Sequence, residues 1–125
     1  MKRIEGLIAA AYPPLDNNGN LNLDAIKSYV EFLTKYKVDG VFLNGSTGDF
    51  ASLSLDERKQ IVAEWSRCKP PEFKMMVHVG DTNVNHSIEL ARHASELDVD
   101  AISSLAPYYT TPNSVSDLVL IYILR

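Results

Sequence analysis

Short apolar runs alternate with amphipathic helical patterns along the whole chain, and this alternation restricts its fold more than any other feature. The apolar runs lie at residues 6–11, 41–43, 75–79 and 101–105. Each is short and has Gly, Pro or Asn at or near at least one end, which is typical of buried strands. Strands that alternate with helices form parallel sheets, because parallel neighbours need helical crossovers. The pattern therefore predicts a parallel sheet.

The first helical pattern follows a polar turn at residues 16–20. Leu23, Ile26, Val30 and Leu33 recur at spacings of three and four residues. This spacing predicts an amphipathic helix, and we expect Asn22 to cap its start.

The second helix has a distinct beginning and end. Ser54 and Glu57 fit a capping box, in which each side chain accepts a hydrogen bond from the backbone N–H of the other. The pair Pro70-Pro71 ends the helix. Its buried side is expected to carry Ile61, Val62 and Trp65.

Two further assignments concern helix faces. The charged run Glu57-Arg58-Lys59 is expected to be a solvated face of the second helix. A third helix is predicted over residues 84–97, with Ile88, Ala91 and Ala94 facing inward.

One internal echo supports a repeated βα unit. Val38-Asp39-Gly40-Val41 resembles Val99-Asp100-Ala101-Ile102, and the two segments start 61 residues apart, which is two units of about 30 residues. Four such units leave two candidates, half of a (β/α)₈ barrel or a small open doubly wound sheet. No G-x-G-x-x-G follows the first run, so a dinucleotide-binding sheet has no positive support.

Composition excludes several classes of protein. A net charge of −4 argues against nucleic acid or an anionic membrane as the main partner. The single cysteine, Cys68, excludes an intramolecular disulfide and fits a reducing compartment. No apolar stretch reaches the roughly 18 residues of a membrane span. We therefore expect one cytoplasmic domain of 125 residues.

Loops after the strands are where parallel folds bind ligands. After the second run comes Gly45-Ser46-Thr47-Gly48, in which two glycines flank two hydroxyls. This arrangement suits a carboxylate or a phosphate. A tight turn whose hydroxyls only cap a helix explains the same residues equally well.

Other candidate residues favour structural roles when taken alone. Tyr108 and Tyr109 follow the fourth run, where packing is a more frequent role than proton transfer. His78, His86 and His93 show no paired spacing on a helix face and no cysteine cluster, so no metal site is predicted.

Several motifs resemble the dihydrodipicolinate synthase/N-acetylneuraminate lyase family in order and spacing, over about residues 5–120. They are G-S-T-G-D at 45–49, S-L-S-L-D-E-R-K-Q-I at 52–61, M-V-H-V-G at 76–80 and A-P-Y-Y at 106–109. Within the family, three features are more like the sialic acid lyases: S-L-S-x-x-E-R at 52–58, H-V-G at 78–80 and E-L-A-x-H-A at 89–94.

The resemblance implies a (β/α)₈ barrel, usually a homotetramer, of which this chain carries the first four βα units. It implies a class I aldolase in which a lysine forms a Schiff base with an α-keto acid, without a cofactor. Ser46 and Thr47 match the pair that binds the substrate carboxylate and aids a proton relay, and Gly45 and Gly48 give close backbone approach. Tyr109 matches the tyrosine that completes the relay in a neighbouring subunit's site.

Three departures qualify the resemblance. Asp49 stands where glutamate is usual. The family's Schiff-base lysine lies on the sixth strand, beyond the four units, so we expect the chain to be inactive alone. Residues 114–125 form an atypical apolar segment, in which residues 118–124 lack the polar positions of an amphipathic helix.

The expected reaction is cleavage of N-acetylneuraminate to N-acetylmannosamine and pyruvate. Two alternatives stay open at this point. One is another pyruvate-dependent aldolase of the family, such as a dihydrodipicolinate synthase. The other is a non-catalytic barrel remnant that acts as an interaction module.

Overall fold

The computed structural model describes residues 3–109 and 112–122 as four strands that alternate with four helices. The elements are, in order, β1 (Ile8–Ala10), α1 (Ala25–Lys35), β2 (Gly40–Leu43), α2 (Leu55–Cys68), β3 (Lys74–His78), α3 (Val84–Ser95), β4 (Ala101–Ser103) and α4 (Val115–Tyr122). The predicted strands are confirmed in position, and β1 and β4 are shorter than the apolar runs that indicated them.

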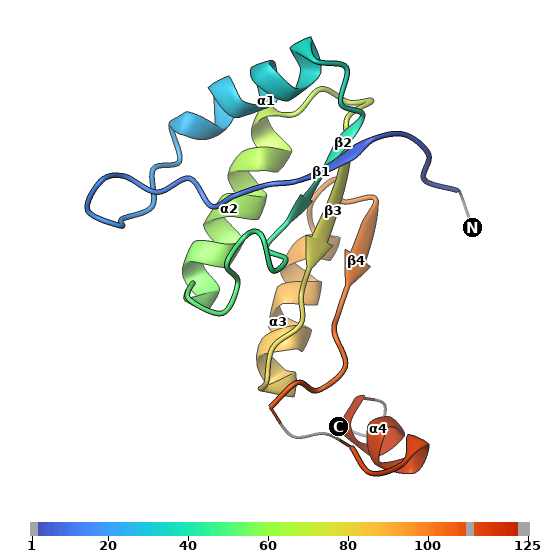
Figure 1. Ribbon diagram of the computed structural model, residues 1–125. Helices are drawn as coiled ribbons and strands as arrows, with labels where there is room; N and C mark the ends of the chain where they lie inside the picture. Colours follow the sequence, from blue (N-terminus) through green and yellow to red (C-terminus); the bar gives the residue numbers. More distant parts are fainter. Residues whose placement is uncertain (1–2, 110–111, 123–125) are drawn as a thin grey trace.

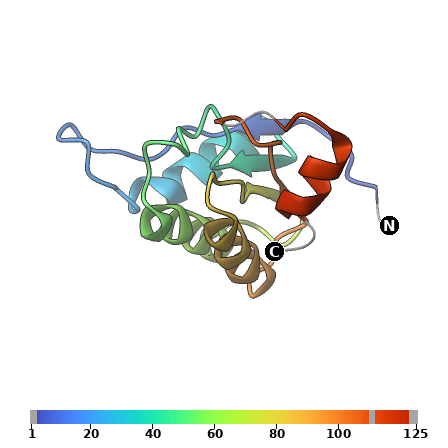
Figure 2. The same cartoon turned by 90° about the horizontal axis from the view of Figure 1, so that it is seen from below.

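The sheet has the topology of a barrel segment. Its strands are all parallel and lie in the order β1-β2-β3-β4. A doubly wound sheet would reverse its strand order and carry helices on both faces, whereas α1, α2 and α3 all lie on one face here (Figure 2). The chain therefore forms the first four βα units of a (β/α)₈ barrel, and the open-sheet alternative is wrong.

The two copies of the Val-Asp echo perform the same structural task. The carboxylate of Asp39 accepts a hydrogen bond from the N–H of Leu7 at 2.7 Å, and the carboxylate of Asp100 accepts one from the N–H of Met75 at 2.9 Å. Each aspartate thus ties the start of one strand to the residue before the next strand. Gly6, at φ 117°, lies so close to Asp39 that a Cβ would be 2.5 Å from the carboxylate.

The sequence predicted the N-terminal cap of α2 correctly and the N-terminal cap of α1 wrongly. The capping box of α2 is confirmed: Ser54 Oγ accepts from the Glu57 N–H, and Glu57 Oε2 accepts from the Ser54 N–H. The predicted cap at Asn22 is wrong, because α1 begins at Ala25 after Asp24, which makes no side-chain cap bond. Asn22 instead accepts from the Ala25 N–H through its backbone carbonyl oxygen and donates its own N–H to the carbonyl oxygen of Pro14.

The core lies between the sheet and the three helices. Val41, Met75 and Val77 are at most 2% exposed and share this face with buried residues of α1 and α2. Trp65 is fully buried, with Tyr29 edge-on at 5.4 Å and Phe73 stacked at 6.4 Å between ring centroids. The predicted burial of Ile61, Val62 and Trp65 is confirmed.

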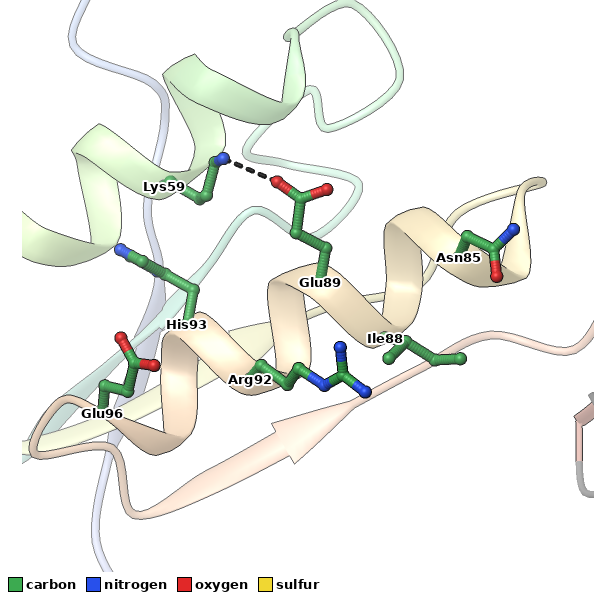
Figure 3. A pocket seen from close by; sticks show the side chains of 7 residues that line it. All are labelled: Lys59, Asn85, Ile88, Glu89, Arg92, His93 and Glu96. Atoms are coloured by element: carbon green, nitrogen blue, oxygen red, sulfur yellow. Dashed lines mark hydrogen bonds and ion pairs between the residues drawn. The ribbon is translucent and has the colours of Figure 1, made fainter.

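The predicted inward face of α3 is partly wrong. Ala94 is buried and Ala91 is half-buried against the core, but Ile88 is half-buried outside the core cluster and points away from α2 (Figure 3). Leu90, which is 5% exposed, fills the inner position instead. The inner row runs through Leu90 and Ala94, one helical turn apart, and Ile88 falls off that row.

α4 differs from the other helices in its position. It lies beyond the carboxyl end of β4, not alongside the sheet (Figure 1). Ile102 shares a register row with Val77, yet Ile102 is 55% exposed and Val77 is 2% exposed.

No helix in the described part of the chain is long and apolar enough to cross a membrane.

Candidate functional site

The candidate site lies at the carboxyl edge of the sheet, where the loops after β2, β3 and β4 meet (Figure 1). Parallel barrels bind their substrates at this edge because the loops that follow neighbouring strands converge there. A cavity of about 150 Å³ opens at this edge and is lined by Phe42, Gly45, Ser46, His78, Ser103 and Leu105.

The loop after β2 has a tight, mostly buried backbone. Gly45 and Gly48 are buried, and the Asp49 N–H donates to the Ser46 carbonyl at 3.1 Å. A Cβ on Gly48 would lie 3.0 Å from the backbone of Asn44, so any larger residue here would press on that backbone. The left-handed conformations fall on Asn44 and Asp49, at φ 54° and 49°, and not on the glycines.

Ser46 and Thr47 lie at the exposed tip of this loop. Among the described residues, neither hydroxyl is engaged in a hydrogen bond and neither backbone N–H donates to a carbonyl. Four donors in one short segment are thus available to a ligand, as an anion site requires. Neither hydroxyl caps α2, because Ser54 is its N-cap residue.

Tyr109 follows β4 at the same edge. It is 86% exposed, and its neighbour Tyr108 contacts the ring of Phe50, edge-on, with centroids 5.9 Å apart. Because Phe50 belongs to the loop after β2, this contact brings the two loops together. The structure thus places Ser46, Thr47 and Tyr109 at the same carboxyl edge of the sheet.

Arg58 is a site residue that the sequence did not reveal, and its assignment to a solvated face is wrong. The side chain is 1% exposed, and Nη2 donates to the carbonyl oxygens of His78 at 2.9 Å and Gly80 at 3.1 Å. Nη1 lies 3.5 Å from Asp81 Oδ2, and the guanidinium packs 5.5 Å from the Phe50 ring centroid. Burial lowers the pKa of Arg58, and the negative charge of Asp81 opposes that shift.

Arg58 therefore fixes the end of β3 to α2 and to the loop after β2. A signal for this role was present in the sequence, since Arg58 lies three, four and seven residues before Ile61, Val62 and Trp65. That spacing puts it on the buried stripe of α2.

His78 is the last residue of β3 and is 1% exposed. Its ring packs edge-on against Phe50, with centroids 4.7 Å apart. Burial first, and then the charge of Arg58, lower the pKa of His78, while hydrogen bonding to the Ser103 backbone opposes that shift.

The remaining polar residues have local roles. His86 Nδ1 lies 3.2 Å from Asp81 Oδ1 at the start of α3. Cys68 is half-buried with Sγ 3.2 Å from Glu64 Oε1, and burial raises the pKa of its thiol. In the described part of the chain, no three His, Cys, Asp or Glu side chains are grouped to hold a metal ion.

A second hollow, of about 600 Å³, lies between α2 and α3 on the outside of the sheet (Figure 3). Its lining carries charges of both signs, and Lys59 pairs with Glu89 at 2.7 Å. It is lined only by residues of the two helices and none from the strand ends, so it is not the candidate site.

No described lysine lies at the carboxyl edge of the strands. Lys74 begins β3 at the opposite edge, and Lys69 follows α2 there, where its Nζ lies 2.6 Å from Asp98 Oδ2. Lys59 is held on α2 by Asp56 and Glu89.

Two of the proteins most similar in sequence to this chain carry the same name, N-acetylneuraminate lyase. The chain is 40% identical over 121 residues to N-acetylneuraminate lyase A of Xenopus laevis, covering 95% of this chain and 40% of that protein. It is 39% identical over 113 residues to N-acetylneuraminate lyase of Homo sapiens, covering 89% of this chain and 35% of that protein. The chain thus spans 35–40% of the length of these relatives.

Solved structures agree with the sequence relatives. N-acetylneuraminate lyase from Proteus mirabilis superposes with a TM-score of 0.90 at 32% identity, covering 96% of this chain and 41% of that one. The lyase from Aliivibrio salmonicida gives a TM-score of 0.89 at 36% identity, covering 97% and 40%. The sequence profile of the dihydrodipicolinate synthetase family matches residues 3–118, and the chain belongs to that family.

Proposed function

We propose that this chain supplies the carboxylate-binding part of an N-acetylneuraminate lyase active site. The observation that carries the proposal is the pair Ser46 and Thr47, whose four donors are unengaged among the described residues, beside a cavity at the carboxyl edge. The identity of 39–40% to proteins named N-acetylneuraminate lyase supports the choice of substrate.

In the proposed reaction, Ser46 and Thr47 bind the carboxylate of the α-keto acid. An imine between a lysine and the keto carbon accepts the electron pair of the breaking C–C bond, which releases N-acetylmannosamine and leaves pyruvate. The two hydroxyls and two amides stabilise the carboxylate and fix the keto carbon for attack. Because no described lysine lies at this edge, the amine must come from outside the described residues.

Tyr109 is proposed to act in a neighbouring subunit. Its ring is 86% exposed although it stands next to the packed Tyr108, so it is free to enter a second site. A phenol in that position can pass a proton along the Ser46 and Thr47 hydroxyls. This role requires a homo-oligomer, which we propose to be a tetramer in the cytoplasm.

Complementation tests the proposal. The chain is co-expressed with the part of Xenopus laevis N-acetylneuraminate lyase A that it does not cover, and the assembly is treated with pyruvate and borohydride. We expect a covalent pyruvate adduct on the added part and release of pyruvate from N-acetylneuraminate.

The variant Ser46→Ala/Thr47→Val should raise the KM for N-acetylneuraminate about tenfold or more, because two hydrogen bonds to a charged group are lost. Ser52→Ala is the matched control: Ser52 lies in the same loop but bonds Asp49 at 3.0 Å, and its loss should leave KM unchanged. An unchanged KM in the double variant would contradict the proposal.

A second candidate is another aldolase of the same family. The structure of 2-keto 3-deoxygluconate aldolase from Picrophilus torridus superposes with a TM-score of 0.84 at 27% identity. Offering the completed assembly 2-keto-3-deoxygluconate beside N-acetylneuraminate decides between them, and the faster-cleaved substrate identifies the activity.

A third candidate, a non-catalytic interaction module, is favoured only by the absence of a described lysine at the site. A pulldown of full-length lyase subunits by the 125-residue chain tests it. Failure to capture them at micromolar concentration would reject it.

A further inference from the structure

Phe50 is a half-buried aromatic residue of the loop after β2, and the proposed reaction does not use it. Its backbone closes that loop, because the Phe50 N–H donates to the carbonyl oxygen of Gly45 at 3.4 Å. Ser46 and Thr47 lie between these two bonded residues. Phe50 therefore belongs to the same short loop as the two unengaged hydroxyls.

The Phe50 ring contacts two side chains that are themselves fixed by burial. The His78 ring packs edge-on with centroids 4.7 Å apart, and the Arg58 guanidinium lies 5.5 Å from the Phe50 centroid, within the range of a cation–π contact. Both partners are 1% exposed, and Arg58 donates to the carbonyl oxygens of His78 and Gly80. Arg58 and His78 thus form a buried framework that holds the Phe50 ring where α2 meets the end of β3.

The third contact of the Phe50 ring reaches an exposed segment. Tyr108 is 51% exposed, and its ring meets Phe50 edge-on, with centroids 5.9 Å apart and planes at 86°. This is the T-shaped geometry that aromatic pairs prefer. Neither Tyr108 nor Tyr109 makes a hydrogen bond to another residue in the described part of the chain. The position of this segment relative to the loop after β2 therefore depends on packing, and Tyr108 packs on Phe50.

This contact matters because the proposed proton relay needs Tyr109 in one definite direction. A segment without a fixed direction would lose conformational freedom each time it entered a neighbouring site, and that loss opposes docking. A ring pair that already holds Tyr108 removes part of the loss in advance.

We propose that Phe50 is a positioning residue: its ring holds Tyr108 on the buried framework and so presents Tyr109 to the neighbouring subunit. This inference rests on the proposed function, in which Tyr109 passes a proton in a second site. Phe50 does not touch the substrate; it acts through Tyr108. Its bond to Gly45 uses only the backbone, so a substitution can remove the ring and leave the loop after β2 closed.

The first test needs no ligand and no activity. Backbone order in the 125-residue chain is measured by the heteronuclear proton–nitrogen Overhauser effect in the wild type, Phe50→Leu and Phe50→Tyr. We expect Phe50→Leu to lose order at Tyr108 and Tyr109 and to keep it at Gly45 and Gly48, whereas Phe50→Tyr retains the ring and the wild-type values. Unchanged order in Phe50→Leu, or an equal loss in Phe50→Tyr, would overturn the inference.

Phe32→Leu is the matched control. Phe32 is 55% exposed and forms a ring pair of the same kind with Tyr36 on α1, with centroids 4.8 Å apart. Its loss should leave the order at Tyr108 and Tyr109 unchanged. A loss there as large as that in Phe50→Leu would show a general effect of removing a ring and would count against Phe50.

The second test measures cleavage of N-acetylneuraminate by the completed assembly. Phe50→Leu should lower kcat about three- to tenfold and leave KM within about twofold, because the proton relay is weakened while the carboxylate-binding loop stays closed. Tyr108→Leu should lower kcat to the same degree, and the double variant should lose no more than either single variant, because both remove one ring pair. A raised KM with unchanged kcat, or losses that multiply in the double variant, would overturn the role of Phe50.

The outcomes separate this inference from the proposed function. If Phe50→Leu matches the wild type in order and in kcat while Ser46→Ala/Thr47→Val raises KM, the role of Phe50 fails and the function stands. If the wild-type assembly cleaves no N-acetylneuraminate, the proposed function fails, and the order at Tyr109 alone decides whether Phe50 holds this segment. If Phe50→Leu gives no dispersed amide spectrum, Tyr108→Leu replaces it, since it breaks the same ring pair from the exposed side, and unchanged order at Tyr109 would then overturn the inference.

Discussion

The sheet face covered by α1, α2 and α3 differs from the opposite face in how much apolar surface it shields from water. On the helix-covered face Val41, Met75 and Val77 are at most 2% exposed. On the opposite face Phe42 and Met76 are only half-buried, and His78 is the buried exception. The helix-covered side is therefore a packed core over β1 to β3, whereas Ile102 of β4 on the same side is 55% exposed.

The less shielded face is the one that carries the candidate site. In a (β/α)₈ barrel this face is the interior, which side chains from all strands fill in layers. Four strands supply only part of those layers, so their residues keep exposed surface. Stability and ligand binding are thus divided between the two faces, and substitutions can test this division.

The largest expected effect is on the helix-covered face. Trp65→Ala removes a fully buried side chain between Tyr29 and Phe73 and should lower the free energy of unfolding by about 3–5 kcal/mol. Met76→Ala, on the half-buried face, should cost about 1 kcal/mol. Urea denaturation at two protein concentrations measures both. Equal losses would show that the opposite face is also covered, for example by self-association.

The next effect concerns the link across the carboxyl edge. Arg58→Met leaves the carbonyl oxygens of His78 and Gly80 without their donor and should cost about 2–4 kcal/mol. Arg67→Met is the control, since Arg67 is an exposed residue that pairs with Glu64 within α2, and little change is expected. A loss no larger than the control's would mean that Arg58 does not hold the edge together.

A smaller effect is expected at the helix starts that support the covered face. Ser54→Ala removes both hydroxyl bonds of the capping box and should cost about 1 kcal/mol. Asp24→Ala should change stability little, because Asp24 makes no side-chain cap bond. Thermal melts followed by circular dichroism compare them, and a reversed order would contradict the assigned caps.

The smallest effect is a pH dependence from the less shielded face. The pKa of His78 is lowered in the folded chain, so below pH 6.5 the unfolded chain binds a proton that the folded chain excludes. Stability should therefore be complete above pH 6.5 and fall as pH drops toward 5. His78→Phe should reduce that fall, as read from urea midpoints at pH 7.5 and 5.0. His93 also has a lowered pKa, so His93→Gln is the companion variant, and an identical fall in His78→Phe and the wild type would contradict the assignment.

The sequence predicted most of the fold and part of the site. Strand positions followed from apolar runs, and the shared pole of Ser46 and Tyr109 followed from the rule that parallel strands end at one edge. The position of α4 was not predictable, because an apolar segment without a polar face does not indicate which side it covers.

Two residues show why the rest was missed. Arg58 sits in a charged run that is typical of a surface, and only its alignment with Ile61 and Trp65 indicates burial. His78 occupies an ordinary strand position, and its burial depends on Phe50, which is distant in sequence and packs edge-on against its ring. Such tertiary contacts leave no local pattern.

The central claim is that the loop after β2 and the loop after β4 together form a carboxylate-binding site. This site lies at the carboxyl edge of the sheet, on the less shielded face. An amide shift titration of the chain with sodium pyruvate tests it most directly. We predict shifts at Gly45, Ser46, Thr47 and Gly48 and beside Tyr109, with none at Asp39 and Asp100 on the opposite edge. Shifts confined to the opposite edge, or an undisturbed Gly45–Gly48 loop at saturating pyruvate, would contradict the claim.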